Sequence, residues 1–300
     1  MPAPATRRRL RGRLAPGAWA LLASALTALS GAPRALAEER VRVRAGDGVL
    51  DLRLEDYVAG VVSGEMPASF PPEALKAQAV AARSYALTRK IEAQAAGRPF
   101  DIGTGVLHQV WEERPSAAAR AAAEATAGEV LVAGREPVEA YFHAACGGRT
   151  EGGLAALGRD LPYLASVECG KCSGAPGVAW SVRVTAADLA RAAGLAGKAS
   201  AARVASRTAT GRAERVEVTA RGRTASLSAV DLRQRLGFER LPSLAFDVRE
   251  DGGAFVLAGR GRGHGAGLCQ WGAAALAREG MGYREILARY YPGTDVVRMY

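Results

Sequence analysis

The sequence lacks a long hydrophobic run beyond its first 37 residues. Across the rest of the 300 residues, no segment approaches the roughly 18 apolar residues that a membrane-spanning helix needs. The sequence also lacks an internal repeat with a period of roughly 20–50 residues, so a repeat architecture is not expected. These absences predict that the mature part is a soluble protein of one or two domains without a membrane span.

The first 37 residues have the composition of an export signal. Five arginines between positions 7 and 13 form a positively charged start, residues 18–29 are a short apolar core, and residues 35–37 are an A-x-A-type cleavage site. We therefore predict a cleavable signal peptide at 1–37 and a mature chain at 38–300. An uncleaved anchor is the alternative, but the apolar core is too short to span a membrane, and prolines at 16 and 33 interrupt the sequence on either side of it.

Little excess charge remains in the predicted mature chain. The full sequence has 40 Lys and Arg against 30 Asp and Glu, and the first 37 residues carry six of the arginines and no acid, which leaves 34 against 30, or +4. This excess is too small to indicate nucleic-acid binding, but it suits loose attraction to an anionic wall polymer. We expect an exported protein, periplasmic or otherwise extracytoplasmic, that is associated with the cell wall.

The order of the predicted helices and strands indicates an α+β fold, because it lacks regular βαβ alternation. The expected elements are a hairpin at 41–54, helices at 54–62, 72–96 and 115–127, a strand pair at 130–132 and 138–142, a helix at 186–193, strands between 214 and 257 with a short helix at 231–237, and helices at 273–280 and 283–290. The 72–96 helix is alanine-rich, so we expect it to be central and largely buried among mixed short strands. Residues 195–210 are mostly small and polar and are expected to form a loop. The C-terminal half is expected to be β-rich, with a candidate β-rich subdomain at 178–258.

Glu65 is the only charged residue between Tyr57 and Pro72. Its apolar neighbours would raise the pKa of the carboxyl by desolvation, which a general acid working near neutral pH needs. A turn carboxylate that caps the next helix or pairs with an arginine such as Arg83 is the alternative. Gln78 and Arg83 lie among alanines on the predicted buried helix. Since buried polar groups need partners, we expect one or both to face a cleft.

Two further segments could carry chemistry. Residues 141–151, YFHAACGGRTE, end a predicted strand in Cys-Gly-Gly, where paired glycines allow positive φ or close approach of a ligand. Residues 259–272, GRGRGHGAGLCQWG, alternate glycine with other residues, so that another backbone or a sugar ring can pack flat against one face while His264 and Gln270 project. This segment is not a phosphate-binding loop, because no Gly-Lys-Ser/Thr ending is present. Ordinary glycine-rich hairpins are the alternative for both segments.

Together these segments resemble the SpoIID/LytB domain family. The resemblance covers nearly the whole mature chain in the family's order and includes the GEMP element at 64–67, the AQAVAAR helix at 77–83, the GHG element at 263–265 and the YYPG ending at 290–293. It implies work on peptidoglycan. The sporulation branch is a lytic transglycosylase that prefers glycan strands stripped of stem peptides, and the glutamate of the GEMP element, here Glu65, is its proposed catalytic acid. The substrate-binding residues that we predict are Lys76, Gln78, Arg83, Gly147, Gly148, Thr150, His264 and Gln270.

A lytic transglycosylase needs only one carboxylate, whereas ordinary glycosidases use two. The LytB branch of the family is described as an enhancer of a wall amidase. A non-catalytic wall-binding enhancer of an N-acetylmuramoyl-L-alanine amidase is therefore the alternative function, and a hydrolase is a third. The expected partners are peptidoglycan glycan strands and a cell-wall amidase, without nucleic acid. Neither composition nor motif implies a role in sporulation as opposed to division or wall remodelling.

The chemistry needs no cofactor, but the four cysteines suggest a structural zinc ion. Some family members bind zinc just before a Gln-Val-Tyr segment, and the matching stretch here, residues 100–111, has His108 and no cysteine. The cysteines lie elsewhere, with spacings typical of zinc knuckles. We predict zinc at Cys146, Cys169 and Cys172 with either His143 or Cys269 as the fourth ligand. Disulfides, for example Cys146 to Cys269, are the alternative, since spacing leaves the connectivity open.

Overall fold

The computed structural model describes residues 38–105 and 108–300, so the predicted signal peptide at 1–37 lies outside the described residues. The helices are α1 (Leu54–Glu65), α2 (Pro72–Ala95), α3 (Ala117–Ala125), α4 (Gly153–Leu157), α5 (Ala186–Ala192), α6 (Ala229–Leu236), α7 (Gln270–Arg278) and α8 (Tyr283–Tyr290). The strands are β1 (Arg40–Ala45), β2 (Gly48–Arg53), β3 (Ile102–Gly103), β4 (Glu129–Ala133), β5 (Glu136–Pro137), β6 (Phe142–His143), β7 (Ala179–Thr185), β8 (Ala199–Arg207), β9 (Ala213–Ala220), β10 (Arg223–Ser228), β11 (Phe246–Asp251), β12 (Ala254–Arg260), β13 (Leu268–Cys269) and β14 (Asp295–Arg298). The mixture of helices and short strands confirms the predicted α+β class.

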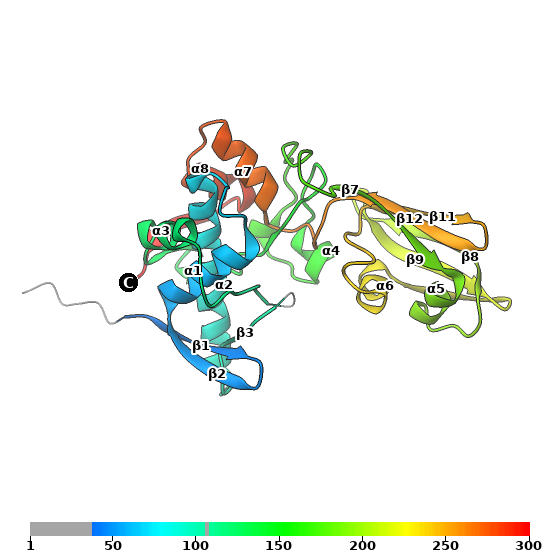
Figure 1. The fold of residues 1–300 in the computed structure, drawn as a ribbon, viewed down its shortest axis with the longest axis horizontal. Helices are drawn as coiled ribbons and strands as arrows, with labels where there is room; N and C mark the ends of the chain where they lie inside the picture. The colour runs from blue at the N-terminus through cyan, green and yellow to red at the C-terminus, as the bar shows by residue number, and fades with distance from the viewer. Residues whose placement is uncertain (1–37, 106–107) are drawn as a thin grey trace, which may run out of the picture. The chain divides into compact units, whose positions relative to one another are not determined.

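Helix α2 is the centre of the larger hydrophobic core. Pro72 occupies its first turn, where a missing N–H costs nothing, and its interior consists mostly of strong helix formers. The small alanine side chains let α1, α3, α7 and α8 pack closely around it, as the cyan helix in Figure 1 shows. Because α7 and α8 come from the end of the chain, they bring the glycine-rich segment back to the N-terminal GEMP element.

Three small sheets border this core. The strand orders are β2-β1-β3, β14-β4-β5 and β13-β6. The two-residue strands β6 and β13 pair in parallel, with Phe142 opposite Leu268 and His143 opposite Cys269. This pairing joins the two glycine-containing segments that the sequence analysis selected.

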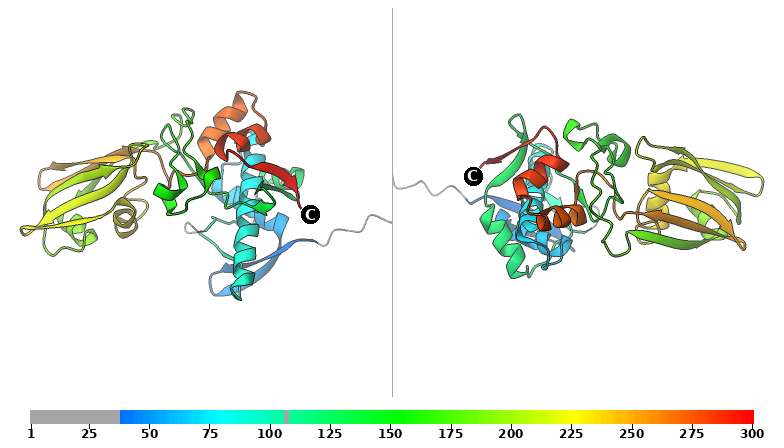
Figure 2. Two further views of the ribbon diagram at one scale, coloured as in Figure 1. Left: turned by 180° about the vertical axis from the view of Figure 1, so that it is seen from behind. Right: turned by 90° about the horizontal axis from the view of Figure 1, so that it is seen from above.

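A second hydrophobic core lies between residues 184 and 257. It is formed by the sheets β11-β12-β7 and β10-β9-β8, with α5 and α6 packed against them, and Figure 2 shows these sheets from two further directions. Thr185 caps α5 by accepting a hydrogen bond from the backbone N–H of Asp188. These elements fall in the range of the candidate β-rich subdomain at 178–258, which stays a prediction.

Two predictions about strands were wrong. Residues 195–210 contain strand β8 instead of a loop, because β9 supplies a pairing partner to alanines and serines that have little strand preference of their own. Residues 138–142 do not form a hairpin with β4, which instead pairs with β5 and with the C-terminal strand β14. None of the helices in the described part of the chain is long and apolar enough to cross a membrane.

Candidate active site

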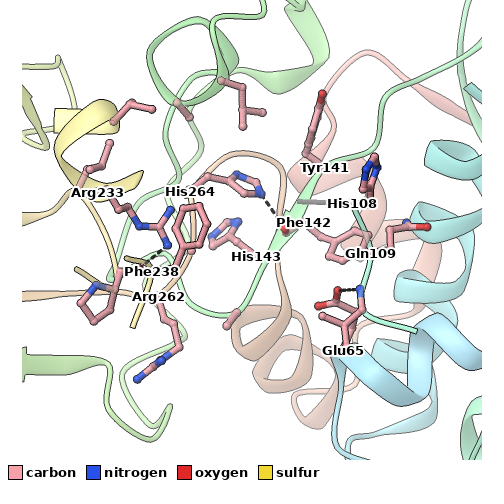
Figure 3. Close-up of a pocket in the computed structure, with 18 of the residues that line it drawn as sticks. Glu65, His108, Gln109, Tyr141, Phe142, His143, Arg233, Phe238, Arg262 and His264 are labelled. Carbon is pink, nitrogen blue, oxygen red and sulfur yellow. Dashed lines mark hydrogen bonds between the residues drawn. The ribbon is translucent and has the colours of Figure 1, made fainter. Parts of the chain in front are cut away.

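A cavity of about 380 Å³ brings distant parts of the chain together around Glu65. Its wall includes residues near the end of α1, the segment before α3, strand β6, helix α6 and the glycine-rich segment (Figure 3). Of the two carboxylates that line it in the described chain, Glu239 is 92% exposed and pairs loosely with Arg262, whereas Glu65 is largely shielded from water. Glu65 is therefore the carboxylate whose chemistry the cavity can alter.

Two hydrogen-bond donors hold the Glu65 carboxylate. The backbone N–H of Val110 donates to Oε1 at 2.8 Å, and the side-chain amide of Gln270 donates to Oε2 at 3.3 Å. Burial raises the pKa of the Glu65 carboxyl above its usual range, while the hydrogen bonds from Val110 and Gln270 act in the opposite direction. The group can hold a proton more readily than an exposed glutamate and still has donors for its ionised form.

Two glycines of α1 place the Val110 donor. An added Cβ at Gly60 would lie 2.3 Å from Nε1 of Trp111, and one at Gly64 would lie 2.8 Å from the carbonyl oxygen of Val110. The segment around Val110 can therefore rest against the helix only because these positions carry no side chain. This contact puts the Val110 N–H beside Glu65, the last residue of α1.

Gln270 and Gln78 lie behind the cavity wall beside Glu65. Both side chains are buried, and the Gln270 amide is 3.5 Å from the side-chain oxygen of Gln78. The Nε2 atom of Gln78 is buried without a hydrogen-bond partner among the described residues. A buried amide without a partner is costly, so an ordered water is the partner expected at this donor. Both residues were predicted as binding residues, and the structure brings them to Glu65.

His264 and His143 line the cavity as neutral rings. Nε2 of His264 is 2.8 Å from the carbonyl oxygen of Phe142, and its Nδ1 accepts from the backbone N–H of Ala266, which sets the tautomer. Burial lowers the pKa of His264 to about 4. Nδ1 of His143 is 3.0 Å from the carbonyl oxygen of Ala266, and its buried Nε2 has no partner among the described residues. In the view of Figure 3 the two rings lie between Glu65 and Arg233.

The glycines of residues 261–267 pack against other parts of the same chain, at Gly261 and Gly267 against backbone. An added Cβ at Gly267 would lie 2.0 Å from the carbonyl oxygen of Tyr141, and one at Gly263 would lie 2.7 Å from Cβ of His143. Of the two partners considered for this face, another backbone or a sugar ring, the structure has the backbone. The glycines thus position His264 and hold the segment beside β6.

The sequence analysis missed one wall of the cavity. Arg233 of α6, together with Phe238 and Arg262, lines the side opposite Glu65 in Figure 3. Burial lowers the pKa of Arg233 to about 10, and its guanidinium donates to the carbonyl oxygens of Leu241 and Pro242. Arg262 lies in the glycine-rich segment at 259–272, but for Arg233 the only available signal was the set of basic residues in the β-rich part. It gave no indication of proximity to a glutamate far away in the sequence.

Arg83 does not face the cavity, contrary to expectation. Its side chain is fully buried, pairs with Glu55 at 2.5 Å, and donates to the carbonyl oxygens of Ala123 and Glu129. These partners satisfy a buried cation and tie α2 to α1 and to the end of α3. Its position supports a structural contribution and offers no contact to a ligand in the cavity.

Four other residues predicted to bind substrate also lie away from the cavity wall. Lys76 pairs with Glu73 at 2.6 Å, and the hydroxyl of buried Thr150 accepts from the backbone N–H of Val167. Gly147 and Gly148 have positive φ angles and form a turn. The carbonyl oxygen of Gly148 accepts hydrogen bonds from the backbone N–H groups of Cys169 and Gly170. A close approach at Gly147 does occur, but the neighbours are the side chain of Arg260 and the backbone of residues 260–261.

The four cysteines form one buried group. The sulfurs of Cys146, Cys169, Cys172 and Cys269 all lie within 4.8 Å of one another. His143 is not a member of this group. Of the two residues considered from the sequence as a fourth ligand, Cys269 lies with the other three sulfurs and His143 does not.

Comparisons with known proteins agree with the motifs. The family model described as "SpoIID: Stage II sporulation protein" matches residues 46–132. The chain is 30% identical to stage II sporulation protein D of Bacillus subtilis over 269 residues, which cover 84% of this chain and 76% of that protein. It is 35% identical to an uncharacterised protein of Brachyspira hyodysenteriae over 255 residues, 83% of this chain and 68% of the relative. It is 27% identical to the amidase enhancer of Bacillus subtilis over 293 residues, 79% of this chain and 40% of the enhancer.

Proposed function

The chain belongs to the SpoIID/LytB family, a cell-wall-related family, and on that premise we propose that it is a peptidoglycan lytic transglycosylase with Glu65 as general acid and base. It would act on glycan strands in the cell wall outside the cytoplasm. The observation that carries the proposal is the environment of Glu65. It is the shielded carboxylate of the cavity, its pKa is raised by burial, and two donors are in place for its ionised form.

The proposed reaction uses one carboxylate twice. Protonated Glu65 donates its proton to the oxygen that bridges C1 of N-acetylmuramic acid and C4 of N-acetylglucosamine, and the C1–O bond breaks. The resulting carboxylate then takes the proton of the muramyl C6 hydroxyl, whose oxygen closes onto C1. The products are a free C4 hydroxyl and a 1,6-anhydro end, and no water is consumed. A second shielded carboxylate is therefore unnecessary, in contrast to ordinary glycosidases.

The donors around Glu65 suit this alternation. Burial favours the protonated form that starts the reaction, while the Val110 N–H and the Gln270 amide stabilise the carboxylate that must exist halfway through it. Gln78 is fully buried and does not line the cavity, but its side-chain oxygen accepts from the Gln270 amide and so helps to hold that donor beside Glu65.

A second candidate function is that of a non-catalytic enhancer of a wall amidase. The similarity to the amidase enhancer of Bacillus subtilis favours it. Under this alternative the cavity would bind a glycan strand without cutting it, and Glu65 would act as a hydrogen-bond acceptor only.

One assay separates these functions. The chain from residue 38 is incubated with denuded glycan strands, and the products are analysed by mass spectrometry for 1,6-anhydromuramyl ends. We expect Glu65→Gln to reduce their release about 10²–10⁴-fold, the usual contribution of general acid–base catalysis. Glu73→Gln, which alters a nearby carboxylate outside the cavity, should retain release. Equal release by the wild type and Glu65→Gln would refute the assignment, and products heavier by one water would indicate a hydrolase.

A further inference from the structure

The four-cysteine group is assembled from three separate parts of the chain. Cys146 follows β6, Cys169 and Cys172 lie in the loop before β7, and Cys269 is the N-cap of α7. Each is at most 2% exposed. Packing alone does not require cysteine at any of these four buried positions, because an apolar side chain of similar size would fill each of them. Four thiols from three segments in one buried group therefore indicate a role beyond packing.

The spacing of the sulfurs matches one tetrahedral metal ion. With zinc–sulfur bonds of about 2.3 Å, the ligands of a tetrahedral Zn²⁺ site lie about 3.8 Å from one another. The Cys146 and Cys172 sulfurs are 3.5 Å apart, and no separation in the group exceeds 4.8 Å. A disulfide needs a sulfur–sulfur distance of about 2.05 Å. An iron–sulfur cluster would need room for iron and sulfide between the thiolates.

We infer that Cys146, Cys169, Cys172 and Cys269 bind one Zn²⁺ as a structural site. Binding converts four thiols into thiolates and releases four protons to solvent, so that the complex carries a charge of −2. All four positions are filled by protein sulfur, which leaves no open position for water or substrate. His143 is excluded as a ligand because it lies outside the group of four sulfurs.

The surroundings of the sulfurs suit a negatively charged complex. The backbone N–H of Cys146 is 3.3 Å from the Cys269 sulfur, and the hydroxyl of Tyr290 is 3.2 Å from the Cys169 sulfur. The guanidinium of Arg212, only 5% exposed, donates to the carbonyl oxygen of Cys146 at 2.8 Å. A buried cation and two donors beside the thiolates offset the cost of burying the complex.

The backbone around the four cysteines is closely packed and hydrogen-bonded, as in a preformed metal site. The carbonyl oxygen of Gly148 accepts from the N–H groups of Cys169 and Gly170, which joins the two cysteine turns. An added Cβ at Gly272 would lie 2.6 Å from the Cys169 sulfur, so α7 can approach the metal ligands only with glycine there.

The zinc ion would fix the active-site cavity from outside. Cys146 ends the segment that contributes Tyr141, Phe142 and His143 to the wall, and Cys269 directly precedes Gln270, which donates to Glu65. Loss of the metal would leave both of these segments less firmly held. The zinc site therefore stabilises the arrangement of residues around Glu65, and the ion itself takes no part in the reaction.

Metal analysis of the chain from residue 38, purified from the periplasm without chelator, tests the inference. We expect one zinc per chain, an intact mass corresponding to four reduced cysteines after denaturation, and a loss of about 10 °C in Tm on treatment with a strong zinc chelator. Cys269→Ser and Cys172→Ser should lose stoichiometric zinc, whereas His143→Gln should keep it. If the cysteine variants do not fold, Co²⁺ substitution of the wild type should give the visible bands of a tetrahedral thiolate site.

Several results would overturn the zinc site. A mass lower by two or four hydrogens in the unreduced protein would establish disulfides. Stoichiometric iron in place of zinc would establish a different centre. If Cys269→Ser retained zinc and His143→Gln lost it, the fourth ligand would be His143 and not Cys269. None of these results depends on whether the protein cleaves glycan strands.

Discussion

Gly64 lies against the carbonyl oxygen of Val110 so closely that a Cβ at Gly64 would be 2.8 Å from it. Gly64 directly precedes Glu65, and the Val110 N–H is the nearer of the two donors to the Glu65 carboxylate. The small size of one residue in the GEMP element thus determines the hydrogen bonding of the next. The element is a structural unit in which the glycine positions the donor and the glutamate receives it.

Gly64→Ala should therefore impair activity although alanine is the better helix former. Helix propensity alone would favour alanine by about 1 kcal/mol, but the new methyl group must push the segment around Val110 away from α1. We expect at least about a tenfold loss of kcat, since a displaced donor no longer stabilises the carboxylate. The release of 1,6-anhydro ends measures this loss. Gly152→Ala, where a Cβ meets nothing within 4 Å and φ is −68°, is the matched control. Full activity of Gly64→Ala would contradict the positioning argument.

Gln270→Met should shift the pH dependence of the reaction upward. The Gln270 amide donates to the carboxylate and so lowers the pKa of Glu65, against the dominant effect of burial. Without this donor the pKa rises further, and Glu65 keeps its proton to a higher pH. The alkaline limb of the kcat/KM profile, which reports the free enzyme's acid, should move up by as much as about one unit, or about 1.4 kcal/mol. Gln94→Met, a change at an exposed position of α2, should leave the limb unchanged. A shift to lower pH would exclude Gln270 as a donor to the ionised form.

Sequence patterns predicted the helices and Glu65 better than they predicted the cavity. Helix α2 was expected at 72–96 and spans Pro72–Ala95, because its composition and its proline start act locally. The role of Arg83 depended on Glu55 and on the end of α3, which no local pattern reveals. Arg233 could not be assigned to the site for the same reason, because its local sequence is that of an ordinary surface helix. Arg262 lies in the glycine-rich segment that was selected, but nothing in that segment singled it out. Only the folded chain places both arginines on the cavity wall opposite Glu65.

The His264 imidazole should make the folded state less stable in mild acid. Burial lowers its pKa from 6.5 to about 4 in the folded chain. Between these values the unfolded chain binds a proton that the folded chain does not, so the free energy of unfolding falls as pH falls through this window. From pH 7 to pH 5 the loss is on the order of 2 kcal/mol. Denaturant unfolding at pH 7 and at pH 5 measures this loss of unfolding free energy. The loss should be smaller in His264→Gln than in the wild type. His108→Gln, at an exposed ring, should reduce it less. An unchanged pH dependence in His264→Gln would refute the assignment of this loss to His264.

Arg262 is the cation of the cavity wall that is freest to bind a substrate anion. Its backbone is fixed by hydrogen bonds in both directions with Ala145, so the side chain can be changed without moving the segment. Its guanidinium is 44% exposed and lies 3.5 Å from Glu239, which is itself 92% exposed. Such a surface pair contributes little, and a ligand can displace it at small cost. A glycan strand without stem peptides offers a lactyl carboxylate on each muramyl residue, whereas a strand with stem peptides has an amide there.

Arg262→Gln should therefore raise KM for denuded strands by up to about tenfold and change KM for peptide-bearing strands little. The difference corresponds to the loss of one charge-assisted hydrogen bond, discounted for exposure. Higher ionic strength should narrow the gap between wild type and variant, because salt screens exposed charges. Arg249→Gln, in β11 and outside the cavity, is the matched control, since it removes the same charge from the chain. An equal rise of KM for both kinds of strand would mean that Arg262 attracts the wall polymer as a whole. It would then not distinguish the free carboxylate from the amide.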